Sequence, residues 1–98
     1  MKFDTGDSVI IVLRDPREKL LGVLDEINAA GITMRGIDLS YYDDWVQSIV
    51  KDEPYLPMND YFLPMWRVER VMRDESSGEI GSMAEQFEKR TGKRLDEF

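Results

Sequence analysis

Apolar runs and short polar breaks alternate along the amino-terminal part of the chain. Residues 9–13 (VIIVL) and 20–24 (LLGVL) are almost wholly apolar. Residues 32–37 (ITMRGI) follow the period of two that is typical of a strand. We therefore predict three strands over residues 8–14, 19–27 and 32–37. The breaks at Asp15-Pro16 and at residues 28–31 favour tight turns, so the three strands form an antiparallel meander that begins a small barrel.

The first two strands carry signs of how this sheet is packed. An uninterrupted apolar strand is typical of a strand buried on both faces, here by a barrel interior on one side and a helix or a neighbouring subunit on the other. Gly22 lies inside the second strand, where glycine often marks a sharp bend or a bulge. We interpret Gly22 as the place where the sheet curls, the alternative being a surface glycine without a structural role.

A helical period replaces the strand period after residue 38. Asp38 or Ser40 can cap the helix, and two acidic residues at its start suit the positive end of its dipole. Apolar side chains then recur at steps of three and four on one face, at Tyr42, Trp45, Val46, Ile49 and Val50. Glu53-Pro54 ends the helix, and residues 54–59 are predicted to form a loop.

Residues 60–74 return to extended structure. Pro64 has no backbone N–H for a ladder, so the strand over residues 60–66 is predicted to lie at an edge of the sheet or to contain a bulge. Val68 and Val71 are separated by three positions rather than two. We therefore predict a turn of 3₁₀ helix over residues 67–69 and a last strand over residues 70–74.

The remaining residues predict a helical extension, so we divide the chain into a barrel of residues 1–75 and an extension of residues 76–98. Ser82 and Glu85 have the spacing of a capping box, and Gly92 suits a left-handed helix end. Leu95 and Phe98 are expected to fold back onto the body. Three placements stay open: the helix covers its own barrel, swaps onto a neighbour, or stays mobile. We expect a chain that ends at Asp74 to fold but to assemble less well.

The net charge of the chain limits the classes of molecule that we expect it to bind. The 98-residue chain has a net charge of −7, and residues 38–60 alone hold six acidic side chains and one lysine. Such a chain repels phosphate backbones, which disfavours non-specific binding to nucleic acid. No apolar stretch of the sequence approaches the length of a membrane span or of a signal segment. We expect a cytoplasmic protein that does not contact membranes.

The residue inventory gives little support for catalysis. The sequence contains no histidine to act as a base near neutral pH and no cysteine to act as a nucleophile or as a metal ligand. Two pairs of adjacent carboxylates occur, Asp25-Glu26 and Asp43-Asp44. Neighbours on a strand point to opposite faces and neighbours on a helix diverge, so neither pair converges. We expect no enzyme activity, no cofactor and no metal site.

The order of elements resembles the Sm-like small barrels, the family of the Sm, LSm and Hfq proteins. The resemblance rests on the first strand (residues 9–13), on Gly22-Val23-Leu24 as the family's Gly-x-Leu, and on residues 62–71 as its strand–turn–strand closure. It implies a mainly β fold: a five-stranded, strongly bent SH3-like or Sm-like barrel, here with one helix between strands three and four and a carboxy-terminal helix. It also implies a ring of identical subunits, joined by the fourth strand of one and the fifth strand of the next.

The resemblance implies candidate residues for two kinds of contact. Candidates for the subunit interface are Tyr61, Phe62, Met65, Val71 and Met72. Candidates for RNA contact are Asn28, Trp66, Arg67 and Arg70. Asn28 stands where the Sm motif has aspartate, and the Lys-His pair of Hfq is absent, which weakens the case for RNA.

Aromatic side chains gather between the third strand and the last. They are Tyr41, Tyr42, Trp45, Tyr55, Tyr61, Phe62 and Trp66. Such a cluster can stack single-stranded bases, with Arg67, Arg70 and Arg73 nearby. It can equally pack the helix on the barrel or form a subunit interface, and the helical spacing of Tyr42 and Trp45 favours this structural interpretation.

The sequence thus predicts a non-enzymatic interaction or scaffold module that assembles as a cyclic homo-oligomer. A first alternative is a ring that binds single-stranded RNA through the loops around Asn28 and Trp66. A second alternative is a small domain that senses a ligand or a metal through the acidic segment.

Overall fold

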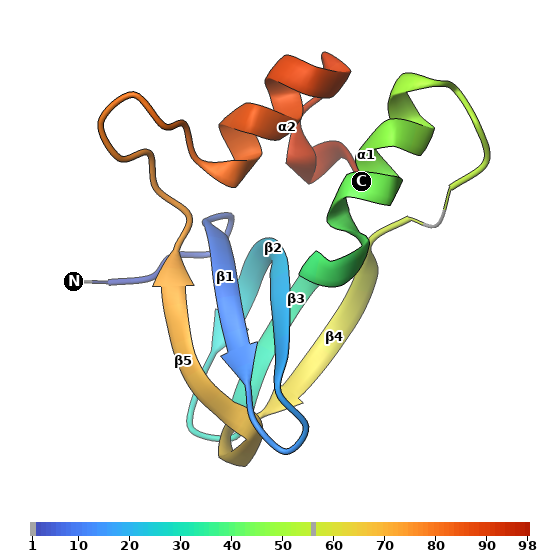
Figure 1. The fold of residues 1–98 in the computed structure, drawn as a ribbon. Helices are drawn as coiled ribbons and strands as arrows, with labels where there is room; N and C mark the ends of the chain where they lie inside the picture. The colour runs from blue at the N-terminus through green and yellow to red at the C-terminus, as the bar shows by residue number, and fades with distance from the viewer. Residues whose placement is uncertain (1, 56) are drawn as a thin grey trace.

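A computed structural model, which describes residues 2–55 and 57–98, shows one bent antiparallel sheet with two helices at one end (Figure 1). The five strands have the order β4-β3-β2-β1-β5, so β4 and β5 are the outer strands. This confirms the predicted fold class. The strands are β1 (Ser8–Leu13), β2 (Glu18–Ile27), β3 (Gly31–Asp38), β4 (Asn59–Pro64) and β5 (Val68–Arg73), and the helices are α1 (Tyr42–Val50) and α2 (Met83–Thr91). Short 3₁₀ turns cover Leu39–Tyr41, Met65–Arg67 and Leu95–Glu97.

Two glycines face each other across β2 and β3, where the strands leave no room for a side chain. Gly22 pairs with Gly36 in the ladder. A Cβ atom on Gly22 would collide with the carbonyl oxygen of Arg35 and lie 2.7 Å from the Cα of Gly36. A Cβ atom on Gly36 would lie 2.6 Å from the carbonyl oxygen of Leu21. The prediction that Gly22 has a structural role is confirmed. The sequence did not reveal that its partner Gly36 must also be a glycine.

The closing strands differ from the sequence prediction in one respect. The 3₁₀ turn lies at Met65–Arg67, before Val68, and the irregularity inside β5 is a bulge. Val12 pairs with Arg70 and Leu13 pairs with Val68, so the ladder passes over Glu69. Because a bulge adds one residue to the strand, Val68 and Val71 share the inner face at a separation of three. The predicted 3₁₀ turn is therefore present, but it lies two residues earlier than the predicted residues 67–69. The edge position predicted from Pro64 is confirmed.

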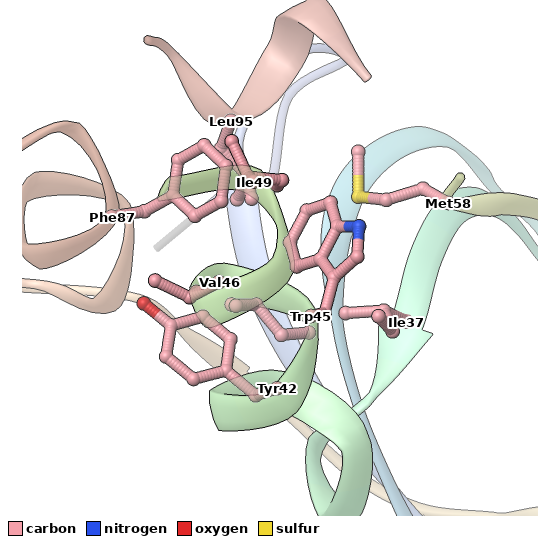
Figure 2. Close-up of a cluster of buried hydrophobic side chains, with 9 residues drawn as sticks. Ile37, Tyr42, Trp45, Val46, Ile49, Met58, Phe87 and Leu95 are labelled. Atoms are coloured by element: carbon pink, nitrogen blue, oxygen red, sulfur yellow. The ribbon is translucent and has the colours of Figure 1, made fainter. Parts of the chain in front are cut away.

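The sheet is buried on both faces by two separate apolar clusters. The inner cluster lies inside the bend and joins Val9, Ile11, Leu13, Leu20, Leu24, Ile32, Met34 and Leu63. The outer cluster lies between the sheet and the helices and joins Leu21, Ile37, Tyr42, Trp45, Val46, Ile49, Met58, Phe87 and Leu95 (Figure 2). This explains the unbroken apolar run of β1: alternate side chains enter the inner cluster, and Ile10 packs against the outer one.

Helix α2 covers the sheet of its own chain, which decides among the three placements left open by the sequence. Phe87 is fully buried and stacks on Trp45 with ring centroids 5.0 Å apart. The Asp74 carboxylate accepts hydrogen bonds from the amides of Met83 (2.7 Å) and Ala84 (2.9 Å) and from the Ser8 hydroxyl (2.9 Å). Asp74 therefore fixes the start of α2 to the end of β5 and the start of β1.

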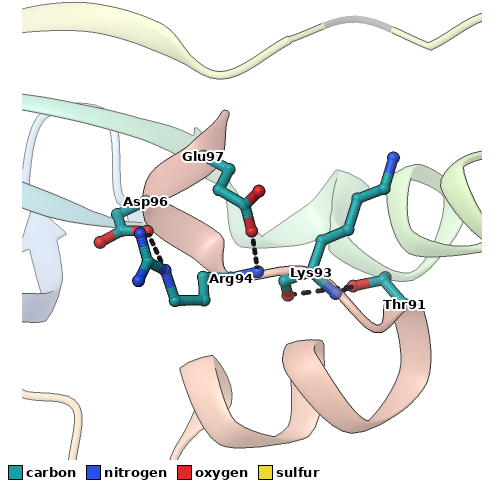
Figure 3. A network of polar contacts seen from close by, with 5 residues as sticks. All are labelled: Thr91, Lys93, Arg94, Asp96 and Glu97. Carbon is teal, nitrogen blue, oxygen red and sulfur yellow. Dashed lines mark hydrogen bonds and ion pairs between the residues drawn. The ribbon is translucent and has the colours of Figure 1, made fainter.

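Both predicted ends of α2 are present. Ser82 and Glu85 form the capping box, and Gly92 ends the helix in the left-handed region with φ 74°. Beyond it the chain reverses through a set of local contacts (Figure 3): the amide of Lys93 donates to the Thr91 hydroxyl (3.1 Å), and the amide of Arg94 donates to the Glu97 carboxylate (2.6 Å). This reversal buries Leu95 and brings the Phe98 ring against Trp45 and Phe87, as expected from the sequence.

Candidate functional site

The first candidate surface consists of the two outer strands, which each pair with one neighbour in the sheet. Phe62 on β4 is 58 % exposed and Met72 on β5 is 36 % exposed. Both are large apolar side chains that point away from the inner cluster. An outer strand also carries backbone N–H and C=O groups that can pair with another chain. The two edges therefore offer both backbone and apolar contacts.

The other three interface candidates are directed elsewhere. Tyr61, Met65 and Val71 are partly buried and pack against the inner cluster. Phe62 and Met72 are therefore the two of the five that are exposed.

The second candidate surface is the end of the sheet opposite the helices, where three turns meet (Figure 1). The amide of Met65 donates to the Ala30 carbonyl (3.0 Å), which joins the β2–β3 turn to the 3₁₀ turn before β5. The Arg14 side chain donates to the Trp66 carbonyl (2.8 Å), which adds the β1–β2 turn. Trp66 lies on this end with 61 % of its surface exposed. The structure thus brings the two predicted RNA-contact loops together.

Two of the four RNA-contact candidates are engaged in structural contacts. The Asn28 side-chain oxygen accepts from the amides of Ala30 (2.9 Å) and Gly31 (3.3 Å) and so shapes its own turn. Arg67 donates to the carbonyls of Arg14 (3.0 Å) and Pro16 (2.7 Å) and to the Glu18 carboxylate (2.9 Å).

The other two candidates face solvent. Trp66 is exposed, and Arg70 has a side chain that is 54 % exposed and lies 3.8 Å from the Glu69 carboxylate. Of the four residues predicted to contact RNA, only Trp66 and Arg70 are therefore open to a ligand at this end of the sheet.

The aromatic cluster predicted from the sequence divides into buried and exposed members. Tyr42 and Trp45 belong to the outer cluster, as their helical spacing predicts. The Tyr42 hydroxyl donates to the Met83 carbonyl at 3.4 Å. Burial raises the pKa of the Tyr42 phenol above its ordinary value of 10.0; Arg90 opposes this rise, while Asp43 and Asp74 add to it. Tyr41, Tyr55, Phe62 and Trp66 are exposed.

A third surface, which sequence reasoning did not single out, is a groove of about 410 Å³ between α1, the end of β3 and the segment that leads into β4. Four residues of one helical stripe line it: Tyr41, Asp44, Trp45 and Ser48. The opposite wall comes from Ile37 and Asp38 and from Pro54, Tyr55, Pro57, Asn59 and Tyr61. The sequence does contain a pattern that indicates this wall of the groove. Steps of three and four, which place side chains on one helical face, relate Tyr41, Asp44, Trp45 and Ser48.

The charged side chains that line this groove are both aspartates, Asp38 and Asp44. Asp38 caps the turn that precedes α1 by accepting from the Ser40 amide (2.8 Å). Asp44 is exposed, and within residues 2–55 and 57–98 it forms no ion pair. Its neighbour Asp43 faces the other way and pairs with Arg90 (3.0 Å). The groove therefore combines aromatic faces with negative charge.

Residues 2–55 and 57–98, which the structure describes, offer neither a cluster of metal ligands nor a helix that could span a membrane. No group of three or more potential ligands (His, Cys, Asp or Glu) gathers there closely enough to hold a metal ion. No helix among the described residues is long and apolar enough to cross a membrane.

Comparisons with known proteins give no relative for this chain. No family model, no curated protein and no solved structure matches it.

Proposed function

We propose that the protein is a non-enzymatic interaction module that assembles with copies of itself by pairing β4 of one chain with β5 of the next. The observation that carries this proposal is the strand order, which leaves two different strands as the outer edges of one bent sheet. The Sm-like resemblance of the sequence implies the same pairing.

Pairing between unlike edges has a geometric consequence. Because β4 and β5 are different surfaces, the contact is heterologous, and a heterologous contact repeats until a ring closes or a filament grows. Phe62 and Met72 would supply the apolar part of this contact, and the edge backbones would supply the hydrogen bonds.

Native mass measured by light scattering on a sizing column tests the proposal. We expect a multiple of the 11.4 kDa chain mass for the unmodified protein and the mass of one chain for Phe62→Glu and for Met72→Glu. Ile80→Glu is the matched control, because Ile80 is 69 % exposed but lies outside both edges. Its mass should stay that of the unmodified protein. A monomeric unmodified protein contradicts the proposal.

Mixing the two edge variants tests the pairing rule itself. Phe62→Glu keeps an intact β5 edge, and Met72→Glu keeps an intact β4 edge. Their mixture should therefore form a dimer and stop there, while each variant alone stays monomeric. A contact of β4 with β4, or of β5 with β5, would instead leave one of the variants dimeric when measured alone.

A second candidate function, single-stranded RNA binding at the turn end, is favoured by one observation: Trp66 is exposed, and its carbonyl accepts from the Arg14 side chain. The exposed Arg70 follows in β5. Exposed aromatic rings flanked by arginine can stack on bases. Fluorescence anisotropy with labelled oligouridine tests it. Trp66→Ala and Arg70→Glu should abolish binding, whereas Arg67→Glu is unsuitable because Arg67 holds the β1–β2 turn. Absence of binding at low salt rules this candidate out.

A further inference from the structure

We propose that the groove beside α1 binds an extended, proline-containing segment of a partner protein that carries an arginine or lysine side chain. The inference goes beyond self-assembly, because the groove is formed within a single chain. Three independent properties of the groove support it.

The first property is the kind of surface that lines the groove. Tyr41 is 64 % exposed and Tyr55 is 40 % exposed, so both rings offer faces to a ligand. Tyr61, Pro54 and Pro57 add further flat apolar surface. Aromatic-lined grooves of this kind suit extended peptides in the polyproline conformation, since such peptides lose little entropy on binding.

The second property is charge. Asp38 and Asp44 line the groove, within a stretch of residues 38–60 that holds six acidic side chains and one lysine. A guanidinium or ammonium group in the groove would meet a carboxylate and an aromatic face together, and both attract a cation. The same charge repels the phosphates of a nucleic acid, which favours a basic peptide as the occupant.

The third property is a buried donor without a partner. Trp45 is 4 % exposed, and its indole nitrogen has no hydrogen-bond acceptor in residues 2–55 and 57–98. In Figure 2 the nitrogen edge of this ring points away from Phe87, toward the side of the view where Met58 and Ile37 lie. Of these two residues, Ile37 also lines the groove.

A buried donor left unpaired is destabilising, and a carbonyl group of a bound peptide would remove that cost. Because the nitrogen is covered, a carbonyl reaches it only after the groove side chains move apart.

The two tryptophans of the chain provide the test, because Trp45 lines the groove and Trp66 lies at the opposite end of the sheet. Indole N–H signals of the ¹⁵N-labelled protein are followed by NMR during titration with a peptide of repeated Pro-Pro-Arg units. We expect the Trp45 signal to shift saturably and the Trp66 signal to stay in place. A peptide of repeated Pro-Pro-Glu units should leave both signals unchanged.

A matched pair of helix variants shows whether the groove is responsible. Asp44→Asn should weaken binding about tenfold, because its carboxylate lines the groove. Asp43→Asn removes the same charge from the same helical turn, but Asp43 pairs with Arg90, so binding should be unchanged. Tyr41→Ala should weaken binding at least as strongly as Asp44→Asn, and its exposed position makes misfolding an inadequate explanation.

Three results would overturn the inference: an unmoved Trp45 signal, equal binding of the acidic peptide, or equal effects of Asp43→Asn and Asp44→Asn. The titration is repeated on Phe62→Glu, whose altered edge side chain is not part of the groove lining. Since assembly is read from native mass and peptide binding from the Trp45 signal, either proposal can fail while the other holds.

Discussion

The two ends of this sheet are built by different means. At the helix end, α1, α2 and the last residues cover the outer face of the sheet with a stacked aromatic core. At the turn end, three loops are joined through backbone carbonyls by the side chains of Arg14 and Arg67. One end therefore depends on apolar burial and the other on directed polar contacts. The acidic groove and the arginine-bearing surface therefore lie at opposite ends of the sheet.

The largest expected effect is at the helix end. The sequence led us to expect that a chain ending at Asp74 would fold, but the structure shows that Phe87 and Leu95 complete the outer cluster. We now expect that chain to lose cooperative unfolding altogether, because Leu21, Val46 and Trp45 would face water. A melt followed by circular dichroism checks this. A sharp transition near the melting temperature of the full chain would contradict it.

A graded version of the same test uses a single side chain. Phe87→Ala should lower the free energy of unfolding by about 3 to 5 kcal/mol, since Phe87 is fully buried. Ile80→Ala in the exposed segment before α2 is the control and should change it by less than about 0.5 kcal/mol. Denaturant titration measures both values.

A smaller effect is expected at the turn end. Arg67→Ala should lower the free energy of unfolding by about 1 to 2 kcal/mol, because Arg67 donates to two carbonyls and to Glu18. Arg70→Ala is the matched control, and should cost less than about 0.5 kcal/mol because its ion pair with Glu69 is long and exposed. Equal losses from the two substitutions would mean that the Arg67 contacts do not hold this end together.

The smallest effect concerns Tyr42 and high pH. The folded state raises the pKa of this phenol above 10.0 mainly through burial, so the unfolded state releases the proton first as the pH rises. The stability that depends on the neutral phenol is present below pH 10.0 and is lost as the pH climbs through the folded pKa. Tyr42→Phe should therefore flatten the alkaline decline in the free energy of unfolding, whereas Tyr41→Phe, at an exposed position, should leave the decline in place.

Much of the fold could be predicted because local sequence patterns in this chain correspond to local structure. The apolar run of β1, the alternation in β3, the capping box at Ser82 and the glycine at the end of α2 each correspond to one structural feature. The 3₁₀ turn before β5 was predicted two residues too late, and the bulge at Glu69 was missed. A separation of three apolar positions has two structural explanations, a helical turn or a bulge.

Long-range contacts explain what the sequence did not reveal. Nothing local in Asp74 indicates that its carboxylate caps a helix that begins at Met83. Arg67 looks like a ligand-binding side chain in the sequence, and only the folded chain shows that it closes the β1–β2 turn. The groove was missed for the same reason, because much of its second wall lies outside the helical pattern of α1, at Pro54, Tyr55, Pro57, Asn59 and Tyr61.

The pairing of β1 with both β2 and β5 has a consequence for the order of folding. Ile11 contacts Leu20 across a short turn, whereas its other partner, Val71, is distant in sequence. Closing a long loop costs more entropy than closing a short one, so we expect the β1–β2 and β2–β3 hairpins to form before β5 docks. Until then β1 itself is an open edge. The β5 strand of a second chain can occupy that edge, so concentrated refolding is expected to favour strand exchange.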